Sequence, residues 1–388
     1  MESQVSSYGL GLIFIVLVSM IWAASSILVQ YLYENQSFDS PFLLTYIGTS
    51  LFTILLPLDW LLQQYGERSQ SFPSEENERY ALSEDHENGD EVHRGHRKWT
   101  LQDHKDAAAK VAPVWFISNY AFNASLRYTS ITSSTVLAST GSVFTFLFAL
   151  LWRDEHFSVL KLLGVGLGMM GSILTGLHDV HGSSTRMRFL AADNDHGLWG
   201  DALALLSAVG YGVYAVMIRV FCPKDESLMS MQQFLGFIGL YNMVALSPIA
   251  LWQSIRTAAI SALVLASLIV KGLLDNVLSD YLWARAVVLT SATVASVGLG
   301  LTIPLAFLSD VIMGRPNIFD ASSILGALSV LFGFVLVNVG QKRVDGENEI
   351  ETVVHAVDDE EGRQDVQTEQ YQNTSSNYSD TEGALEIT

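Results

Sequence analysis

Residues 127–136 read Arg-Tyr-Thr-Ser-Ile-Thr-Ser-Ser-Thr-Val, and residues 285–294 read Arg-Ala-Val-Val-Leu-Thr-Ser-Ala-Thr-Val. The two stretches share the residues at their first, sixth, seventh, ninth and tenth positions. Self-similarity at a fixed displacement is typical of chains built from repeated units. The pair of stretches therefore predicts an internal duplication, which the pattern of hydrophobic segments around them can support or weaken.

Ten apolar runs, each of about 20 residues, follow one another along the chain. Their approximate bounds are 8–31, 41–62, 107–127, 130–151, 159–177, 197–218, 231–252, 260–284, 288–309 and 319–340. A helix of about 20 residues crosses the ~30 Å hydrocarbon core of a bilayer. Strands of membrane barrels instead alternate between apolar and polar residues. The sequence predicts an all-α polytopic membrane protein with ten transmembrane helices, for which the lipid bilayer is the first partner.

The repeated stretch lies between the third and fourth runs in its first copy and between the eighth and ninth in its second. Two units of five spans would therefore follow each other, and an odd number of spans turns the second unit upside down. A chance match between Ser/Thr-rich helices is the alternative, but the span count supports duplication independently. We predict two inverted five-helix repeats, an architecture found in many secondary transporters.

The charge of the chain is concentrated outside the apolar runs. The sequence has 40 acidic and 21 basic residues, a formal net charge of −19, although only 16% of its residues are charged. Residues 63–105 hold 10 acidic and 6 basic side chains, and residues 341–388 hold 13 and 3. Segments so polar and so poor in aromatic residues cannot bury a core, so both are predicted to be disordered.

This distribution of charge divides the chain and excludes several classes of protein. An acidic chain is a poor partner for nucleic acid, whose phosphates require clustered Lys and Arg. The single cysteine, Cys222, excludes a disulfide framework. The predicted parts are residues 1–62 (spans 1 and 2), 63–105 (acidic loop), 106–177 (spans 3 to 5), 197–340 (the second repeat) and 341–388 (acidic tail).

The Lys and Arg residues predict the orientation in the membrane. Cytoplasmic loops of membrane proteins carry an excess of positive residues. With the N-terminus in the cytosol, 15 Lys and Arg residues fall in cytosolic segments and 5 on the opposite side, while Lys271 lies inside a span. Both termini and both acidic segments are therefore predicted to face the cytosol.

Several stretches carry a resemblance to a known family. They are Asn123-Ala-Ser-Leu-Arg-Tyr-Thr-Ser, Ser139-Thr-Gly-Ser-Val-Phe-Thr, Trp199-Gly-Asp-Ala-Leu-Ala-Leu-Leu-Ser-Ala, Leu278-Ser-Asp-Tyr-Leu-Trp-Ala-Arg-Ala and Gly298-Leu-Gly-Leu-Thr-Ile-Pro. In these residues the chain resembles the drug/metabolite transporter superfamily, with its paired EamA-type halves of five helices. Within that superfamily it is most similar to the F5-like branch of solute carrier family 35, subfamily F.

The resemblance covers about residues 8–340 and implies a ten-helix transporter of an endomembrane. Fungal relatives of this branch are vacuolar membrane proteins, so a vacuolar or lysosomal type of membrane is expected, with the Golgi or plasma membrane as alternatives. The resemblance implies neither a particular substrate nor a cofactor.

Charged residues within spans are the first candidates for a functional site. An ionisable side chain at the centre of a span costs about 2.5–3.5 kcal/mol on insertion scales, so its presence suggests a role. Lys271 and Asp275 are four residues apart and share a helix face. They could bind an anion and a coupling proton, or they could form a structural pair that neutralises itself. Asp280 and Arg285, nearer the cytosolic end, are candidates for gating or interfacial contacts, as is Arg127, the counterpart of Arg285.

Polar and aromatic side chains also recur at helical spacing along several spans. Such faces can line a cavity in which rings stack on a substrate and amides bind its edges. Interhelical hydrogen bonding by Ser, Thr and Asn is the common alternative. Pro304, after two glycines in the ninth span, could mark a hinge. The cavity candidates are Trp22, Ser26, Gln30, Trp115, Asn119, Asn123, Thr135, Ser139, Tyr211 and Tyr214.

Two further patterns are better explained by structure than by cofactor binding. Gly166, Gly168 and Gly171 have the spacing of a dinucleotide fingerprint, but they lie within the fifth span and follow no strand. Glycines four residues apart, such as Gly164 and Gly168, are typical of closely packed membrane helices. Pairs of histidines occur only without further nearby ligands, so no metal site is predicted.

The sequence therefore predicts a secondary-active transporter that moves a small polar metabolite by alternating access, and not an enzyme. A nucleotide-sugar-like molecule or another organic solute is the expected small-molecule substrate, and a homodimer is one option for assembly. One alternative is a non-transporting scaffold or sorting protein that acts through the acidic segments. The other, with less support, is an intramembrane enzyme.

Overall fold

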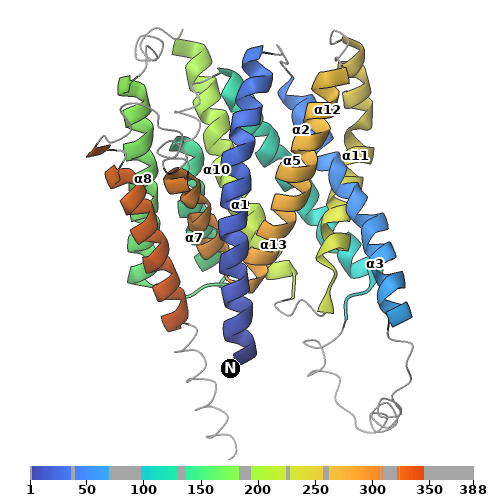
Figure 1. The fold of residues 1–388 in the computed structure, drawn as a ribbon, viewed down its shortest axis with the longest axis horizontal. Coiled ribbons are helices and arrows are strands. Elements are labelled where there is room, and N and C mark those ends of the chain that lie inside the picture. The colour runs from blue at the N-terminus through green and yellow to red at the C-terminus, as the bar shows by residue number, and fades with distance from the viewer. Residues whose placement is uncertain are drawn as a thin grey trace, which may run out of the picture. The chain divides into compact units, whose positions relative to one another are not determined.

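The structure, a computed structural model, describes residues 2–35, 40–69, 98–128, 136–182, 194–223, 228–256, 262–305, 308, 321–322 and 324–344. Within these ranges the chain is helical and has no strand, so the predicted all-α class is confirmed (Figure 1). Residues Met1–Asn338 form one compact unit and Val339–Thr388 a second. Most of the two acidic segments and of the first copy of the repeated stretch lies outside the described residues. The predicted inversion of the two halves therefore stays a prediction.

Each predicted span falls mainly on helix where the structure describes it. The first half contains α1 (Glu2–Asn35), α2 (Pro41–Ser50), η1 (Leu51–Ile54), α3 (Leu55–Ser69), α5 (Leu101–Tyr128), α7 (Gly141–Leu151) and α8 (Val159–Gly182). The second half contains α10 (Asn194–Phe221), α11 (Met231–Arg256), α12 (Ala262–Lys271), η4 (Gly272–Leu278), α13 (Ser279–Leu289), α14 (Ala292–Gly298), η5 (Leu299–Leu301) and a last helix, Ile324–Val344. The second span is the continuous run α2–η1–α3, and the eighth is α12–η4–α13, in which η4 is π-helical.

Serine caps set two of the helix starts. Ser40 precedes α2, its side chain accepts a hydrogen bond from the backbone N–H of Leu43, and Pro41 occupies the first turn. Ser291 precedes α14 and accepts in the same way from the N–H of Val294. Serine satisfies the free N–H groups of a first helical turn, and proline fits there because it has no N–H. The second copy of the repeated stretch is thus the place where α13 ends and α14 begins.

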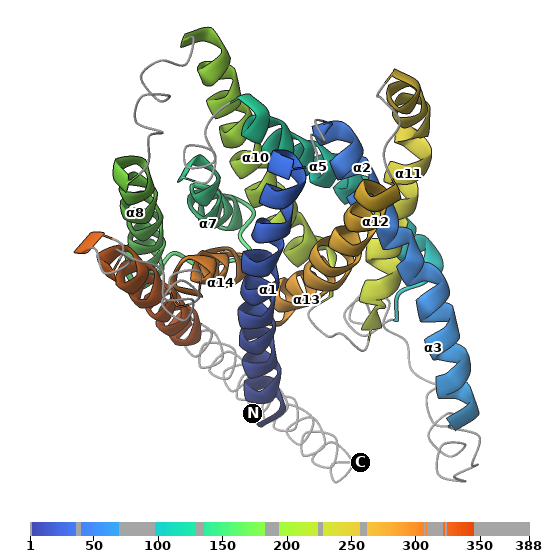
Figure 2. The same cartoon turned by 45° about the horizontal axis from the view of Figure 1, so that its top comes forward.

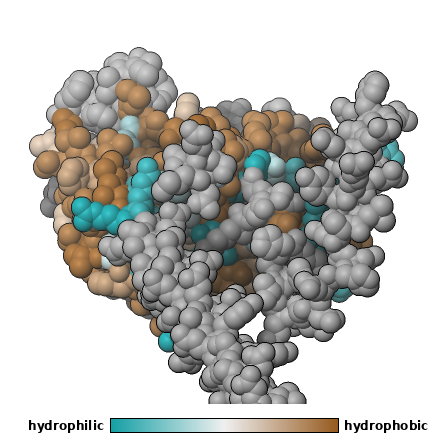
Figure 3. All heavy atoms as spheres, turned by 90° about the horizontal axis from the view of Figure 1, so that it is seen from below, coloured by the Kyte–Doolittle hydropathy of each residue, from teal (hydrophilic) through white to brown (hydrophobic). Residues whose placement is uncertain are grey.

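Among the residues that the structure describes, four helices are long and apolar enough to cross a membrane: Pro41–Gln64, Leu198–Phe221, Met231–Ile255 and Ile324–Val344. Shorter apolar helices are Ser7–Trp22, Val136–Leu151, Val159–Thr175 and Ala292–Leu305. Large apolar side chains are exposed along these helices, and Figure 3 shows such side chains over much of the described surface in that view. Exposed apolar area of this extent fits a surface in contact with lipid.

The helices of the two halves interleave. α5 packs against α10, α1 against α13, and α7 against both α10 and α14. α1 and α13 lie side by side in both ribbon views (Figures 1 and 2). One buried core therefore contains residues from both halves, including Trp115 of α5 and Trp283 of α13.

Close helix packing accounts for the glycine-rich stretch of α8. A Cβ atom on Gly164 would lie 2.6 Å from the carbonyl oxygen of Gly333, and one on Gly171 would lie 2.5 Å from that of Gly326. Backbone atoms cannot move aside as a flexible side chain can, so both positions require glycine. The stretch is a packing face against the last helix, as the sequence indicated, and not a dinucleotide fingerprint.

The same helix provides a matched pair of variants to test this packing. Gly171→Ala should destabilise the protein by about 1–3 kcal/mol, the usual penalty for overpacking. A Cβ on Gly166 would meet nothing within 4 Å, so Gly166→Ala should be neutral or slightly stabilising because alanine favours helix. Thermal unfolding in detergent measures both. Equal unfolding temperatures for the two variants would contradict the packing explanation.

Candidate functional site

Four aromatic side chains from three helices meet in the core between the halves. The ring centroid of Trp115 on α5 lies 4.6 Å from that of Tyr214 on α10 and 5.9 Å from that of Trp283 on α13. Tyr211 lies 5.2 Å from Tyr214 and 5.5 Å from Trp283. Both tryptophans are 1% exposed. We call these four residues the aromatic quartet.

Three polar atoms of the aromatic quartet are buried without a hydrogen-bond partner among the described residues. They are Nε1 of Trp115, Nε1 of Trp283 and the hydroxyl oxygen of Tyr211. The Trp283 indole N–H lies close enough to the Tyr211 hydroxyl to interact with it, but not in the geometry of a well-formed hydrogen bond. Buried indole N–H and phenol O–H groups normally find a partner, and a group left unpaired costs about 1–3 kcal/mol. The quartet therefore offers the indole N–H of Trp115, and the poorly aligned Tyr211 and Trp283 groups, to a molecule that supplies better partners.

A buried carboxylate lies beside the aromatic quartet. Asp280 precedes Trp283 by three residues on α13, is 7% exposed, and is hydrogen-bonded to the side chain of Asn276. It is near enough to interact electrostatically with Tyr211 and Tyr214. The sequence placed Asp280 near the end of a span, but α13 continues to Leu289. Asp280 therefore lies beside the central residues of α10 instead.

Lys271 and Asp275 form the ion pair that their spacing predicted. Nζ of Lys271 lies 2.7 Å from Oδ2 of Asp275, and the side chains are 11% and 19% exposed. Lys271 ends α12, and Asp275 belongs to the π-helical η4. Single π-helical turns within α-helices are frequent at functional sites. The pair's two charges neutralise each other, so Asp280 remains as an additional negative group.

Other predicted cavity residues use their polar groups within the protein. Asn119 donates to the Trp115 carbonyl at 2.9 Å, and Ser139 to that of Val136 at 2.6 Å, each within its own helix. Trp22 Nε1 donates to Ser279 Oγ at 2.8 Å, and Asn123 Nδ2 to Thr45 Oγ1 at 3.0 Å, both to a neighbouring helix. For these four residues the structure favours hydrogen bonding within the bundle over lining a cavity.

The remaining predicted residues lie at the edges of the site or outside the description. The guanidinium carbon of Arg285 lies 5.0 Å from the ring centroid of Phe14 and 5.7 Å from that of Tyr281. Pro304 is partly buried in a short α-helical turn that follows the 3-10 helix η5. Thr135 and the side chains of Ser26, Gln30 and Arg127 lie outside the described residues.

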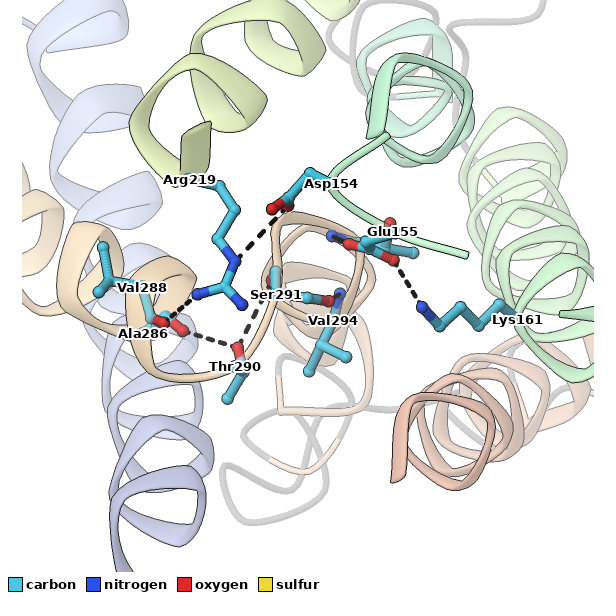
Figure 4. Close-up of polar contacts among 10 residues, drawn as sticks. Asp154, Glu155, Lys161, Arg219, Ala286, Val288, Thr290, Ser291 and Val294 are labelled. Carbon is cyan, nitrogen blue, oxygen red and sulfur yellow. Dashed lines mark hydrogen bonds and ion pairs between the residues drawn. The ribbon is translucent and has the colours of Figure 1, made fainter. Parts of the chain in front are cut away.

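A second polar site joins the halves at one end of the helices, and Figure 4 shows it. Lys161 Nζ lies 2.8 Å from Glu155 Oε2, with side chains 0% and 2% exposed. The other carboxylate oxygen, Oε1 of Glu155, accepts a hydrogen bond of 3.1 Å from the backbone N–H of Thr293. Glu155 thus connects the α7–α8 segment of the first half with the first turn of α14 in the second half.

An arginine completes this connection. Nε of Arg219, at the end of α10, lies 3.5 Å from Oδ2 of Asp154, and both side chains are 9% exposed. Nη1 of Arg219 also donates to the backbone carbonyl of Val288 on α13. We call Asp154, Glu155, Lys161 and Arg219 the charged interlock. The sequence alone does not reveal it, because Lys161 and Arg219 have the positions of ordinary solvated residues at helix ends.

A third polar cluster ties α3 and α5 to the start of α11. Asp59 accepts hydrogen bonds from Ser230 Oγ at 2.6 Å and from Gln233 Nε2 at 2.8 Å. The backbone N–H of Ser230 donates to Nε2 of His104 at 3.0 Å. Since α11 begins ten residues after α10 ends, this cluster and the charged interlock lie at the same end of α10 and α11. Two polar contacts therefore close that end between the halves.

Comparison with known proteins identifies the family. Residues 106–177 match the EamA-like transporter family. An uncharacterized vacuolar membrane protein of Saccharomyces cerevisiae is 30% identical over 370 residues, 88% of this chain and 93% of that protein. The chain belongs to the EamA-type transporters related to solute carrier family 35, subfamily F.

Further relatives agree with this assignment. A thiamine-repressible mitochondrial transport protein of S. cerevisiae is 30% identical over 85% of this chain and 91% of its own length. Solute carrier family 35 member F5 of Mus musculus is 30% identical over 58% of this chain and 42% of that protein. One solved crystal structure has a TM-score of 0.57 at 14% identity, covering 88% of this chain and 99% of the other, which shows a shared fold.

The side chains gathered at the aromatic quartet are of types that bind a small molecule. Among the residues that the structure describes, no three His, Cys, Asp or Glu side chains are grouped to hold a metal ion. The aromatic quartet presents ring faces and unpaired hydrogen-bonding groups, with Asp280 beside them. This donor set can orient a small organic molecule without changing its covalent bonds.

Proposed function

We propose that this protein is a secondary-active transporter that binds a small organic solute at the aromatic quartet and moves it across an endomembrane of vacuolar type. The observation that carries the proposal is the set of three unpartnered polar atoms on Trp115, Tyr211 and Trp283, buried between the two halves. A transporter needs a polar site that both halves share and that the solute completes. The name of the S. cerevisiae vacuolar relative supports the choice of membrane.

The charged interlock supports an alternating-access mechanism. Transport of this kind requires that contacts at the two ends of the helices break in turn while the central site persists. The charged interlock and the contacts of Asp59 with Ser230 and Gln233 hold one end closed by polar bonds between the halves. With the orientation that the Lys and Arg residues favour, this end faces the cytosol. The structure then corresponds to a state closed toward the cytosol.

The scaffold and enzyme alternatives do not account for the buried polar groups of the aromatic quartet. A scaffold that acts through its acidic segments has no need for unpaired buried donors at its centre. An intramembrane enzyme needs convergent reactive groups, and the site offers binding groups instead. Deleting residues 341–388 separates the views, because a scaffold should lose its function whereas a transporter should still move its solute.

Transport by reconstituted full-length protein tests the proposal. Proteoliposomes exposed to a broad pool of small metabolites should accumulate at least one solute, detected by mass spectrometry of the washed vesicles. Trp283→Phe and Tyr211→Phe keep a ring and remove one unpaired polar group each. Since a net hydrogen bond contributes about 0.5–1.5 kcal/mol, each variant should weaken solute binding by roughly threefold to tenfold.

Neither variant removes a well-formed hydrogen bond, but Tyr211 and Trp283 contact each other, so the unfolding temperature of each variant is measured beside its transport. Trp60→Phe is the matched control, because Trp60 is 57% exposed on α3 and away from the quartet. It should transport as the unmodified protein does. Full transport by both quartet variants, or accumulation of no solute under any gradient, would contradict the proposal.

A further inference from the structure

The charges beside the aromatic quartet do not balance. Lys271 is 2.7 Å from Asp275, so this pair contributes no net charge. Asp280 forms no ion pair of its own among the described residues. Its charged neighbours are Lys271 and Asp275, which are paired with each other, and its other neighbours, Asn276, Tyr211 and Tyr214, carry no positive charge. The site therefore holds one more carboxylate than cations.

An uncompensated carboxylate inside the bundle requires a counter-charge. A buried charge is strongly unfavourable unless it is paired, or unless it is neutralised by a proton. The amide of Asn276 satisfies part of the hydrogen-bonding capacity of Asp280 but none of its charge. A positively charged molecule that enters the site would supply the missing charge.

The aromatic quartet also favours a positively charged molecule. The π faces of Trp and Tyr attract a cation within about 6 Å of the ring centroid, and Trp does so most strongly. The rings of the two tryptophans and two tyrosines pack against one another beside Asp280, with centroid separations of 4.6–5.9 Å. Ring faces and a carboxylate both repel anions. The role of Lys271 as an anion site, one of the two sequence-based options, loses its support because Asp275 already neutralises it.

We propose that the transported solute is a small organic cation that also carries hydrogen-bond acceptors. Asp280 is its counter-ion, the quartet rings pack against the cationic centre, and the indole N–H group of Trp115 binds an acceptor atom. This proposal rests on the proposed transport function and adds the chemical class of the substrate. It predicts discrimination against nucleotide sugars, which are anions.

A series of single-ring compounds that differ in charge tests the class. The probes are 1-methylnicotinamide (cation), nicotinamide (neutral) and nicotinate (anion), together with choline as a non-aromatic cation and UDP-glucose as a nucleotide sugar. Binding to the full-length protein in detergent is measured by tryptophan fluorescence and by thermal shift. We expect 1-methylnicotinamide to bind at least about tenfold more tightly than nicotinamide, and nicotinate and UDP-glucose to bind more weakly still.

Asp280→Asn and a matched control test whether Asp280 causes the preference for a cation. The amide has the shape of the carboxylate and keeps a hydrogen bond with Asn276, so the variant should fold, and its unfolding temperature checks that it does. It should lose the preference for 1-methylnicotinamide over nicotinamide. Asp106→Asn, which removes an exposed carboxylate on α5, should keep that preference.

The outcomes separate the two proposals. Binding of nicotinate or UDP-glucose above that of the cations, an unchanged preference in Asp280→Asn, or no binding of either cation at millimolar concentration overturns the cation class. Transport of a neutral or anionic metabolite that Trp283→Phe weakens would leave the proposed function standing while the cation class falls. If the unmodified protein transports no metabolite from the pool, both the transport function and the cation class are contradicted.

Discussion

Replacing Lys161 by Met should destabilise the protein by roughly 3–5 kcal/mol, because the change leaves Glu155 as an unpaired charge in the interior. The two side chains are 0% and 2% exposed and lie 2.8 Å apart, so water cannot replace the lost ammonium group without disturbing the packing. Glu155 also accepts from the N–H of Thr293, so relaxation of Glu155 would loosen the start of α14. Thermal or denaturant unfolding of the purified protein in detergent measures the effect.

The double variant Lys161→Met/Glu155→Gln is the informative control. Neutral replacement of both members of a buried ion pair is often close to neutral in stability, whereas removal of one member is not. The Gln side chain keeps an acceptor oxygen for Thr293, so the double variant should recover most of the lost stability. Lys98→Met, which changes an exposed lysine just before α5, should change stability by no more than about 0.5 kcal/mol. A single variant as stable as the unmodified protein would show that the ion pair does not hold this end together.

The helices could be predicted from the sequence, because long apolar runs identify membrane-length helices regardless of how they pack. The eighth span shows the limit of such a prediction. Its end was placed near residue 284, but α13 continues to Leu289, where the Ser291 cap starts the next helix. That boundary is set by local capping and by the tertiary contact of Glu155 with Thr293, and hydropathy detects neither.

The candidate site could be predicted in part. Trp115, Tyr211 and Tyr214 follow helical spacing, and the structure brings them together. The same spacing also selected Asn119 and Ser139, whose side chains bond carbonyl groups of their own helices. Side-chain bonds to a carbonyl three or four residues earlier produce the same period as a cavity-facing stripe, so sequence alone cannot separate the two.

The aromatic quartet's fourth member and the charged interlock required three-dimensional information. Trp283 stood in the sequence stretch that carried the family resemblance, but its contact with Trp115 spans 168 residues. Asp154 and Arg219 meet across the two halves, and Glu155 reaches Thr293 over 138 residues. Charges at helix ends are usually solvated, so nothing in the sequence indicates pairing with partners so distant.

Cys222 should react slowly with a maleimide in the unmodified protein and at least about tenfold faster in Arg219→Gln, since each 1.4 kcal/mol removed from the closed state raises the open population tenfold. Cys222 is the only cysteine of the chain, so it serves as a native reporter. It follows α10 by one residue, is 4% exposed, and burial raises the pKa of its thiol above the ordinary value. Both burial and the raised pKa suppress the reactive thiolate in the closed state.

Arg219 is the appropriate residue to change because it fixes the last turn of α10, three residues before the thiol. Its loss removes the ion pair with Asp154 and the hydrogen bond to the Val288 carbonyl. Arg153→Gln is the matched control, since Arg153 is an exposed arginine beside the charged interlock. It should label at the rate of the unmodified protein. Unfolding temperatures of each variant show whether faster labelling reflects opening of this end or loss of the whole fold.

Labelling in sealed vesicles distinguishes a gate from a merely structural contact. A membrane-impermeant maleimide should modify Arg219→Gln faster only from the side that carries both termini, because the charged interlock is proposed to close the cytosolic end. The solute that the protein transports, when supplied from the opposite side, should change the labelling rate of the unmodified protein by shifting it between its two states. If Arg219→Gln lowers the unfolding temperature yet labels no faster, the charged interlock only stabilises the fold. Opening toward the cytosol would then be controlled by contacts other than the charged interlock, while binding at the aromatic quartet would be unaffected.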